Sequence, residues 1–170
     1  NTNGAFAINA TTGQITVANV TMLDREARSN FTLQVTVSDG VNTSSPANVT
    51  INLSDVNDVV PVVSANQSFS LSDTSSNGTT VGTVSATDGD VTPTTFSNWT
   101  ITGGNTGNAF SINQTTGQIT LVNNSTLTGV YPLQVRVSDG VNTSPTQTVN
   151  ITITSGNLNP PIITANQTFT

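Results

Sequence analysis

The chain has 170 residues, of which 34% are hydrophobic and only 7% are charged, and its formal net charge is −6. With three basic residues in total, it lacks the clustered Lys and Arg that a nucleic-acid-binding surface needs to neutralise phosphates. The lack of Cys excludes disulfides and thiolate metal sites, and no apolar run approaches the roughly 20 residues of a membrane span. Ser and Thr supply 51 residues, a composition typical of β-rich surface proteins.

Alternating apolar and polar residues predict short β-strands along the whole chain. In residues 48–54, for example, Val49, Ile51 and Leu53 share one face and polar residues fill the other. The expected strands, in chain order, are residues 14–17, 31–37, 48–54, 62–71, 79–86, 99–102, 118–122, 133–137 and 149–153. About seven short strands per 100 residues, with no helical period, predict an all-β fold of tandem seven-stranded Greek-key β-sandwiches.

The sequence repeats itself with a period of 100 to 104 residues. Residues 1–19 match residues 105–123 at 13 of 19 positions, and residues 33–54 match residues 133–154 at 13 of 22. A period of this size is a whole small domain. We therefore expect the C-terminal part of one repeat in residues 1–57, a complete repeat in residues 58–159, and the first strand of a following repeat in residues 160–170.

Several motifs occur in the order seen in cadherin repeats. They are Leu23-Asp24-Arg25-Glu26, the Val-x-Val-Ser-Asp strand end, the linker Asp55-Val56-Asn57-Asp58-Val59-Val60-Pro61, the segment Ala86-Thr87-Asp88-Gly89-Asp90, and Phe110-x-Ile112 followed by Thr116-Gly117-x-Ile119. In this combination the whole chain resembles a cadherin-like tandem array, which implies an immunoglobulin-like architecture. The low charge and the abundance of Thr and Asn are typical of microbial surface proteins.

The resemblance also implies a calcium site, because calcium in that family lies between successive domains and stiffens the array. The ligands that it implies are Asp24 and Glu26 of the first repeat, Asp55, Asn57 and Asp58 of the linker, and Asp88, Asp90 and Asp139 of the second repeat. One departure is Val59, which stands where the family's linker ends in Asn.

Charge and ligand chemistry support the same metal. Seven of the nine acidic residues would converge on one junction, where they would repel one another unless cations neutralised them. A chain with no His or Cys offers only oxygen ligands, which favour Ca²⁺ over zinc or copper. At the second junction, residues 155–161, Ser155 and Leu158 replace the two linker Asp residues, so we expect a metal-poor and more flexible joint.

Fifteen Asn-x-Ser/Thr sequons are present, which is more than the composition predicts. Two readings remain open. The excess could serve N-glycosylation of an exported protein, with Asn9, Asn77, Asn98 and Asn113 as candidate sites, or it could follow from strand faces in which Asn and Thr alternate.

These features predict a structural or adhesive segment of a long extracellular protein, at the cell surface or secreted. Catalysis is not expected, because one Glu and no His leave little acid/base chemistry at neutral pH. The expected partners are neighbouring repeats of the same protein, through homophilic or filament-forming contacts. The alternative is a subunit of an extracellular filament or sheath that assembles by sharing β-strands between neighbours.

Overall fold

The computed structural model describes residues 4–90, 95–125 and 127–156. It divides into two compact units: residues 1–58 with 89–93, and residues 59–88 with 94–170. The first unit holds β1 (Phe6–Ile8), β2 (Ile15–Val17), the 3₁₀ turn η1 (Val20–Met22), β3 (Asn30–Val35) and β4 (Ala47–Asn52). The second holds β5 (Val62–Val63), β6 (Ser68–Ser72), β7 (Thr80–Thr83), β8 (Ala86–Thr87), β9 (Ser97–Gly103), η2 (Thr106–Asn108), β10 (Phe110–Ile112), β11 (Gln118–Leu121), β12 (Val130–Ser138) and β13 (Gln147–Thr154).

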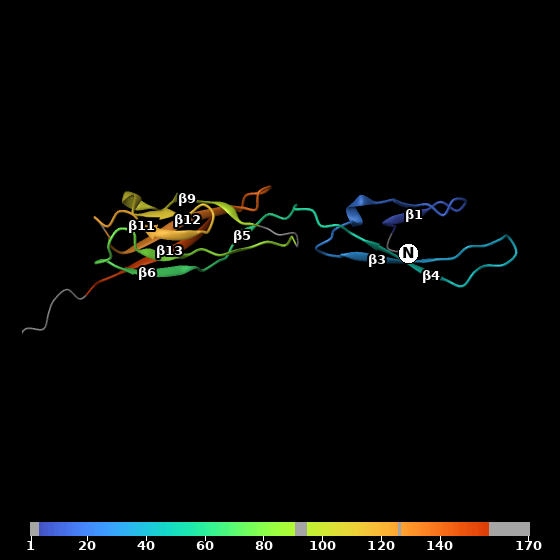
Figure 1. The fold of residues 1–170 in the computed structure, drawn as a ribbon, viewed down its shortest axis with the longest axis horizontal. Coiled ribbons are helices and arrows are strands. Elements are labelled where there is room, and N and C mark those ends of the chain that lie inside the picture. The colour runs from blue at the N-terminus through green and yellow to red at the C-terminus, as the bar shows by residue number, and fades with distance from the viewer. Residues whose placement is uncertain (1–3, 91–94, 126, 157–170) are drawn as a thin grey trace, which may run out of the picture. The chain divides into compact units, whose positions relative to one another are not determined.

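The second unit is a two-sheet sandwich, visible in Figure 1 around β12 and β13. One sheet has the strand order β6-β13-β12-β9 and the other the order β10-β11-β7, while β5 and β8 form a separate pair. All pairings are antiparallel except that of β6 with β13, which is parallel. The predicted all-β sandwich fold is thus confirmed.

Period-2 alternation places the core of this sandwich between its sheets. On β13, Val149 and Ile151 are fully buried, whereas Asn150 between them is exposed. Leu133 on β12 lies opposite Val149 and is also fully buried. Trp99 on β9 is only 3% exposed, so it is a core residue of this unit.

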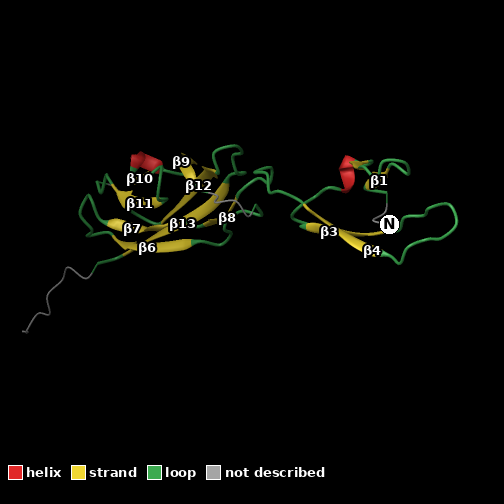
Figure 2. Ribbon diagram, turned by 45° about the vertical axis from the view of Figure 1, so that its right-hand side comes forward, coloured by secondary structure: helices red, strands yellow, loops and turns green. Residues whose placement is uncertain are grey.

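The first unit contains two β-hairpins, β1–β2 and β3–β4, with a long loop between β3 and β4 that is green in Figure 2. Phe6 packs edge-on against Phe31 at a ring-centroid distance of 5.1 Å. The second unit builds the same pair at the equivalent positions, with Phe110 and Tyr131 at 5.0 Å. The repeated sequence therefore produces the same local packing in both units.

Burial differs sharply between the two units. Among the described residues of the first unit, the buried apolar side chains are those of Ala5 and Phe31. The same unit has an open cavity of about 380 Å³, whose lining includes Phe6, Ile8, Ile15, Leu33 and Val35. The repeat equivalents of the last three, Ile119, Leu133 and Val135, are fully buried in the second unit.

Two expected strands are each divided in the structure. Residues 62–71 form β5 and β6 because Asn66 adopts a left-handed conformation with φ 59° and turns the chain. Residues 79–86 likewise divide into β7 and β8. The Gln67 side chain fixes both breaks, since its amide nitrogen donates to the carbonyl oxygens of Ser64 and Ser85 and its oxygen accepts from the Ser85 main chain. The three-residue strands β1 and β10 were not predicted.

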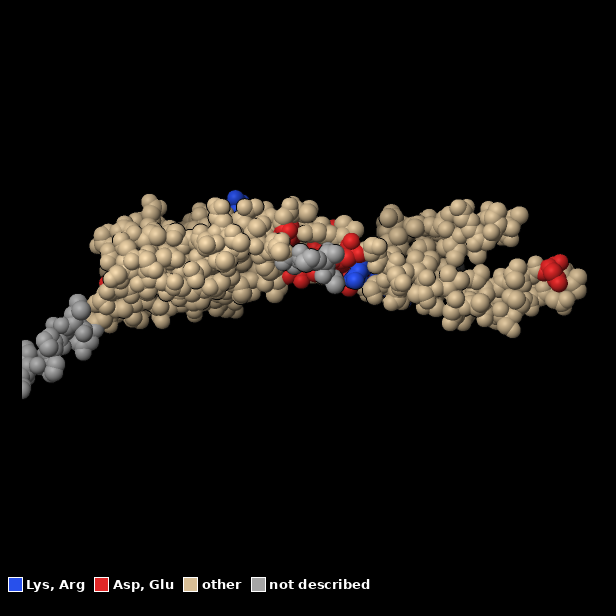
Figure 3. Space-filling view, viewed as in Figure 1, with Lys and Arg blue, Asp and Glu red and all other residues tan. Residues whose placement is uncertain are grey.

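Charged side chains occupy little of the face shown in Figure 3, most of which is coloured as other residues. Within the described part of the chain, no helix is long and apolar enough to cross a membrane. The expected first strand of a third repeat, residues 160–170, lies outside the described residues.

Candidate metal sites

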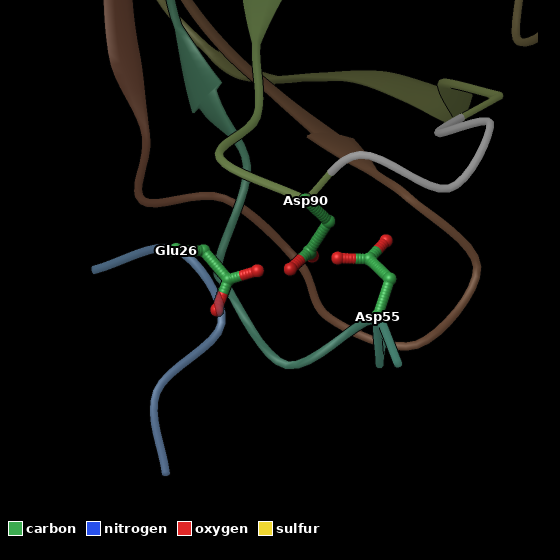
Figure 4. Close-up of side chains that lie close together, drawn as sticks. All are labelled: Glu26, Asp55 and Asp90. Carbon is green, nitrogen blue, oxygen red and sulfur yellow. The ribbon is translucent and has the colours of Figure 1, made fainter. Parts of the chain in front are cut away.

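Three carboxylates come together in the first unit. Oxygen atoms of Glu26, Asp55 and Asp90 all lie within 4.8 Å of one another, and Figure 4 shows their side chains pointing toward a common centre. Glu26 is exposed, Asp55 is partly buried and Asp90 is buried, at 8% exposure. Like charges this close repel one another unless a cation or a proton lies among them.

Each of these residues lies in a loop or turn near the end of an element. Glu26 belongs to a turn after η1, in which the Asp24 carboxylate accepts a 2.8 Å hydrogen bond from the main chain of Ala27. The Arg28 main chain closes the turn by donating to the Asp24 carbonyl oxygen at 2.8 Å. Asp55 follows β4, and Asp90 follows β8. Side chains in such loops are positioned by a rigid sheet yet remain accessible to a ligand.

The electrostatics of the Glu26 carboxyl group reflect this crowding. Its pKa is raised above the ordinary value: a main-chain hydrogen bond acts to lower it, but desolvation and the negative charges of Asp58 and Asp55 outweigh that effect. One cation is also near, because Arg25 Nε lies 3.7 Å from Asp55 Oδ1. The first unit therefore holds excess negative charge that one guanidinium offsets in part.

The second unit contains another pair of carboxylates. Oxygen atoms of Asp88 and Asp139 lie within 4.8 Å of each other, and Asp139 is only 6% exposed. Asp139 Oδ1 accepts hydrogen bonds from the main chains of Val141 at 2.7 Å and Asn142 at 2.6 Å. Burial acts to raise the pKa of Asp139, but these hydrogen bonds outweigh it and hold the pKa below the ordinary value. The same two hydrogen bonds fix the orientation of the Asp139 carboxylate.

The repeated octapeptide makes this turn twice. In the first unit, Asp39 Oδ1 accepts from Val41 at 2.9 Å and Asn42 at 2.7 Å, as Asp139 does in the second. Asp39 is exposed, however. Among the described residues it belongs to neither carboxylate cluster, that of Glu26, Asp55 and Asp90 or that of Asp88 and Asp139. The same local sequence therefore gives the same turn, but only one copy lies beside another carboxylate.

Five of the eight sequence-predicted ligands thus belong to one of the two carboxylate clusters. Of the other three, Asp24 caps the turn that carries Glu26, and Asp58 acts on Glu26 through its charge. Asn57, which lies between the two linker Asp residues in the sequence, is partly buried. The ion pair of Arg25 with Asp55 was not predicted from the sequence. No pattern within the Asp-Arg-Glu motif indicates which carboxylate the guanidinium will contact.

The candidate glycosylation residues all lie on the surface. Asn9 and Asn113 begin equivalent turns, and each side-chain oxygen accepts hydrogen bonds from the main chains two and three residues ahead. Asn77 is exposed in the turn before β7, and Asn98 is exposed on β9 with φ 54°.

Comparison with known proteins gives matches over most of the chain. The family model described as Cadherin domain matches residues 1–54 and 67–154. Protocadherin-11 X-linked of Sus scrofa is 40% identical over 145 residues, covering 81% of this chain and 13% of that protein. Protocadherin Fat 4 of Mus musculus is 36% identical over 170 residues, covering 95% of this chain and 3% of that protein. The chain therefore spans a small part of the relatives that it matches.

Solved structures agree with the sequence matches. Mouse cadherin-23 EC22–24 superposes with a TM-score of 0.69 at 26% identity, covering 91% of this chain and 50% of that one. The human desmocollin-1 ectodomain gives a TM-score of 0.65 at 27% identity, covering 88% of this chain and 30% of that one. The relatives named here are mammalian, so the matches do not support the microbial origin that the composition favoured. The chain belongs to the cadherin family and is a tandem segment of its extracellular, non-enzymatic domains.

Proposed function

We propose that this segment binds Ca²⁺ and serves as a structural and adhesive part of a longer surface protein. The observation that carries the proposal is the set of carboxylates of Glu26, Asp55 and Asp90, whose oxygen atoms lie within 4.8 Å of one another. Residues 1–57 would form the C-terminal part of one repeat, residues 58–159 a complete repeat, and residues 160–170 the start of a third.

The donor set fits calcium by its chemistry. Ca²⁺ takes six to eight oxygen ligands in a flexible geometry, and the chain supplies only oxygen donors at these positions. Asp24, Glu26, Asp55, Asn57, Asp58, Asp88, Asp90 and Asp139 are the proposed ligands. Asp88 and Asp90 are separated by a single glycine in the sequence. A bound cation would supply positive charge among these carboxylates and would fix the positions of the loops that carry them.

Titration calorimetry with CaCl₂ on the chelator-treated chain tests the proposal directly. Saturable binding, together with a melting temperature that rises with calcium concentration, is the expected result. A parallel titration with MgCl₂ should give weaker binding, because Mg²⁺ demands a tighter octahedral geometry and dehydrates reluctantly. An absence of calcium binding heat and of thermal stabilisation would refute the proposal.

The joint after the second repeat should respond less to calcium. At the start of this joint, the carboxylate of Asp73 is already used in hydrogen bonds to the chain. The Gly156 main chain donates to Asp73 Oδ1 at 2.7 Å, and the Ser155 hydroxyl donates to Oδ2 at 3.4 Å. Small-angle scattering of a longer chain that includes both linkers, with and without chelator, tests this difference. Equal stiffening of both joints would show that the ligands are misassigned.

Glycosylation is a further part of the proposal, and side-chain hydrogen bonds rank the sequons. The amide nitrogen of Asn142 donates to the Val59 carbonyl oxygen at 3.3 Å, and that of Asn123 donates to the Gly107 carbonyl oxygen at 3.0 Å, so a glycan on either nitrogen would replace one of its two hydrogens beside an existing bond. Asn9 and Asn113 use their oxygen atoms in the bonds described above, which leaves the nitrogen for attachment. In a host with N-glycosylation, peptide mapping should find Asn9 occupied more often than Asn142, and a bare protein mass would exclude glycans altogether.

A second candidate function, assembly by strand sharing, is favoured by the open side of the first unit. Among the described residues, β3 pairs with β4 alone, whereas its repeat equivalent β12 pairs with both β13 and β9. A strand supplied by a neighbouring molecule would cover Leu33 and Val35, which line the open cavity. Light scattering across a concentration series tests this function, and a monomer at every concentration would exclude it.

A further inference from the structure

Arg25 forms an ion pair with a member of the first carboxylate cluster, Asp55. Its Nε atom lies 3.7 Å from Asp55 Oδ1, and the side chains are 25% and 7% exposed. Asp55 also belongs to the group with Glu26 and Asp90. One carboxylate therefore serves both the guanidinium and the proposed calcium ligand set.

The main chain presents Arg25 at this position independently of the ion pair. Asp24 accepts hydrogen bonds from Ala27 through its side chain and from Arg28 through its carbonyl oxygen, both at 2.8 Å. Arg25 and Glu26 lie inside that turn, so the guanidinium is carried by the same turn as a proposed ligand. A change of the Arg25 side chain should leave this turn intact, because none of its hydrogen bonds uses that side chain.

Arg28 has a different role although it lies only three residues away. Its guanidinium carbon lies 4.9 Å from the centre of the Phe31 ring, in a cation–π contact. Phe31 is 3% exposed and is one of the buried side chains of this unit. The chain thus offers two arginines on one segment, of which Arg25 contacts a proposed ligand and Arg28 contacts the core.

We infer that Arg25 is a built-in counterion that competes with calcium for Asp55 and so lowers the calcium affinity of the site. The inference rests on the proposed calcium function and deepens it. Without calcium, the guanidinium offsets part of the repulsion among the carboxylates and stabilises the metal-free fold. When calcium binds, the same positive charge opposes the ion, and the guanidinium and the ion share the negative charge of one carboxylate.

The test compares Arg25→Gln with Arg28→Gln, because both variants change the net charge by the same amount. Calcium titration of the whole chain should show affinity two- to fivefold higher for Arg25→Gln than for the natural chain, the range expected for one partly exposed ion pair. Arg28→Gln should stay close to the natural affinity. In chelator, Arg25→Gln should melt at a lower temperature than the natural chain. Arg25→Lys keeps the charge and should show an affinity between those of the natural chain and the Gln variant.

The outcomes separate this inference from the calcium proposal. If the natural chain binds no calcium, the proposed function fails. If the natural chain binds calcium but Arg25→Gln binds equally well or more weakly, or if Arg28→Gln gains as much affinity as Arg25→Gln, the competition is wrong. Should Arg25→Gln fail to fold in chelator, an Arg25→Lys variant that binds calcium more weakly than the natural chain would overturn the inference on its own.

Discussion

Replacing Asp90 by Asn should have opposite effects with and without calcium. Asp90 is 8% exposed, and its carboxylate lies within 4.8 Å of those of Asp55 and Glu26. Asn has nearly the same shape as Asp but no charge. In chelator the substitution should stabilise the first unit by removing repulsion, while in calcium it should weaken binding by removing a charged ligand.

The structure sets the size of the metal-free effect. Two unit charges 4.8 Å apart repel by about 1 kcal/mol in bulk water and by about 3.5 kcal/mol at an effective dielectric constant of about 20. Arg25 offsets part of this repulsion at Asp55, so we expect a net gain near the lower figure, about 1 kcal/mol. For a unit of this size that gain corresponds to a rise in melting temperature of roughly 4 to 8 °C. The loss of calcium affinity should reach about tenfold, or about 1.4 kcal/mol.

Differential scanning calorimetry in chelator and in calcium measures both signs on one protein. Asp39→Asn is the matched control, since Asp39 is also an Asp in a turn of the same unit but, among the described residues, belongs to neither carboxylate cluster. It should lower the metal-free stability slightly and leave calcium binding unchanged. If Asp90→Asn lowered the metal-free melting temperature and preserved calcium affinity, the reasoning from repulsion would be refuted.

Three further predictions concern stability. Leu133→Ala should cost about 2 to 5 kcal/mol and shift the unfolding seen by fluorescence of the single Trp, whereas Leu33→Ala at the repeat-equivalent position beside the open cavity should barely move that signal; equal shifts would contradict the burial difference. Asp39 has a pKa lowered by hydrogen bonds from the main chain, so it should contribute stability above about pH 4 that is lost as the pH falls through its folded pKa, a loss that Asp39→Asn should remove from an acid-unfolding curve. Gly104→Ala should cost about 2 to 6 kcal/mol in denaturant unfolding, because φ is +72° and the new Cβ would meet the Pro132 carbonyl group; a neutral result would show that this backbone can adjust.

The fold could be predicted largely from period-2 alternation. Val149 and Ile151 face inward and Asn150 faces outward, as the sequence pattern requires. The break at Asn66 was missed because apolar residues at alternate positions on both sides of it, such as Val63 and Phe69, indicate one continuous strand, and the left-handed conformation of a single Asn leaves no periodic signal. The bridging amide of Gln67 is a long-range contact to Ser85, which local sequence does not reveal.

The candidate site was predictable in its residue types but not in its grouping. The motifs named the acidic residues, yet which oxygen atoms lie together depends on how separate loops fold. Asp39 and Asp139 illustrate the limit, because an identical octapeptide gives the same hydrogen-bonded turn at both positions. Of these two residues, only Asp139 is buried and lies beside another carboxylate among the described residues. Local sequence sets the turn, and tertiary packing decides whether the turn belongs to a site.

Because charged residues are scarce, the two carboxylate clusters are the dominant ionic feature of the described chain. Only 7% of the residues are charged, and five of the nine acidic residues belong to these groups. Elsewhere the fold is held mainly by apolar burial and neutral hydrogen bonds, which respond weakly to ionic strength. We therefore expect divalent cations to change the stability mainly through these carboxylates and through Asp58, whose charge acts on Glu26. Because repulsion opposes folding at these places when no cation is bound, a cation that binds there couples its concentration to the stability of the fold.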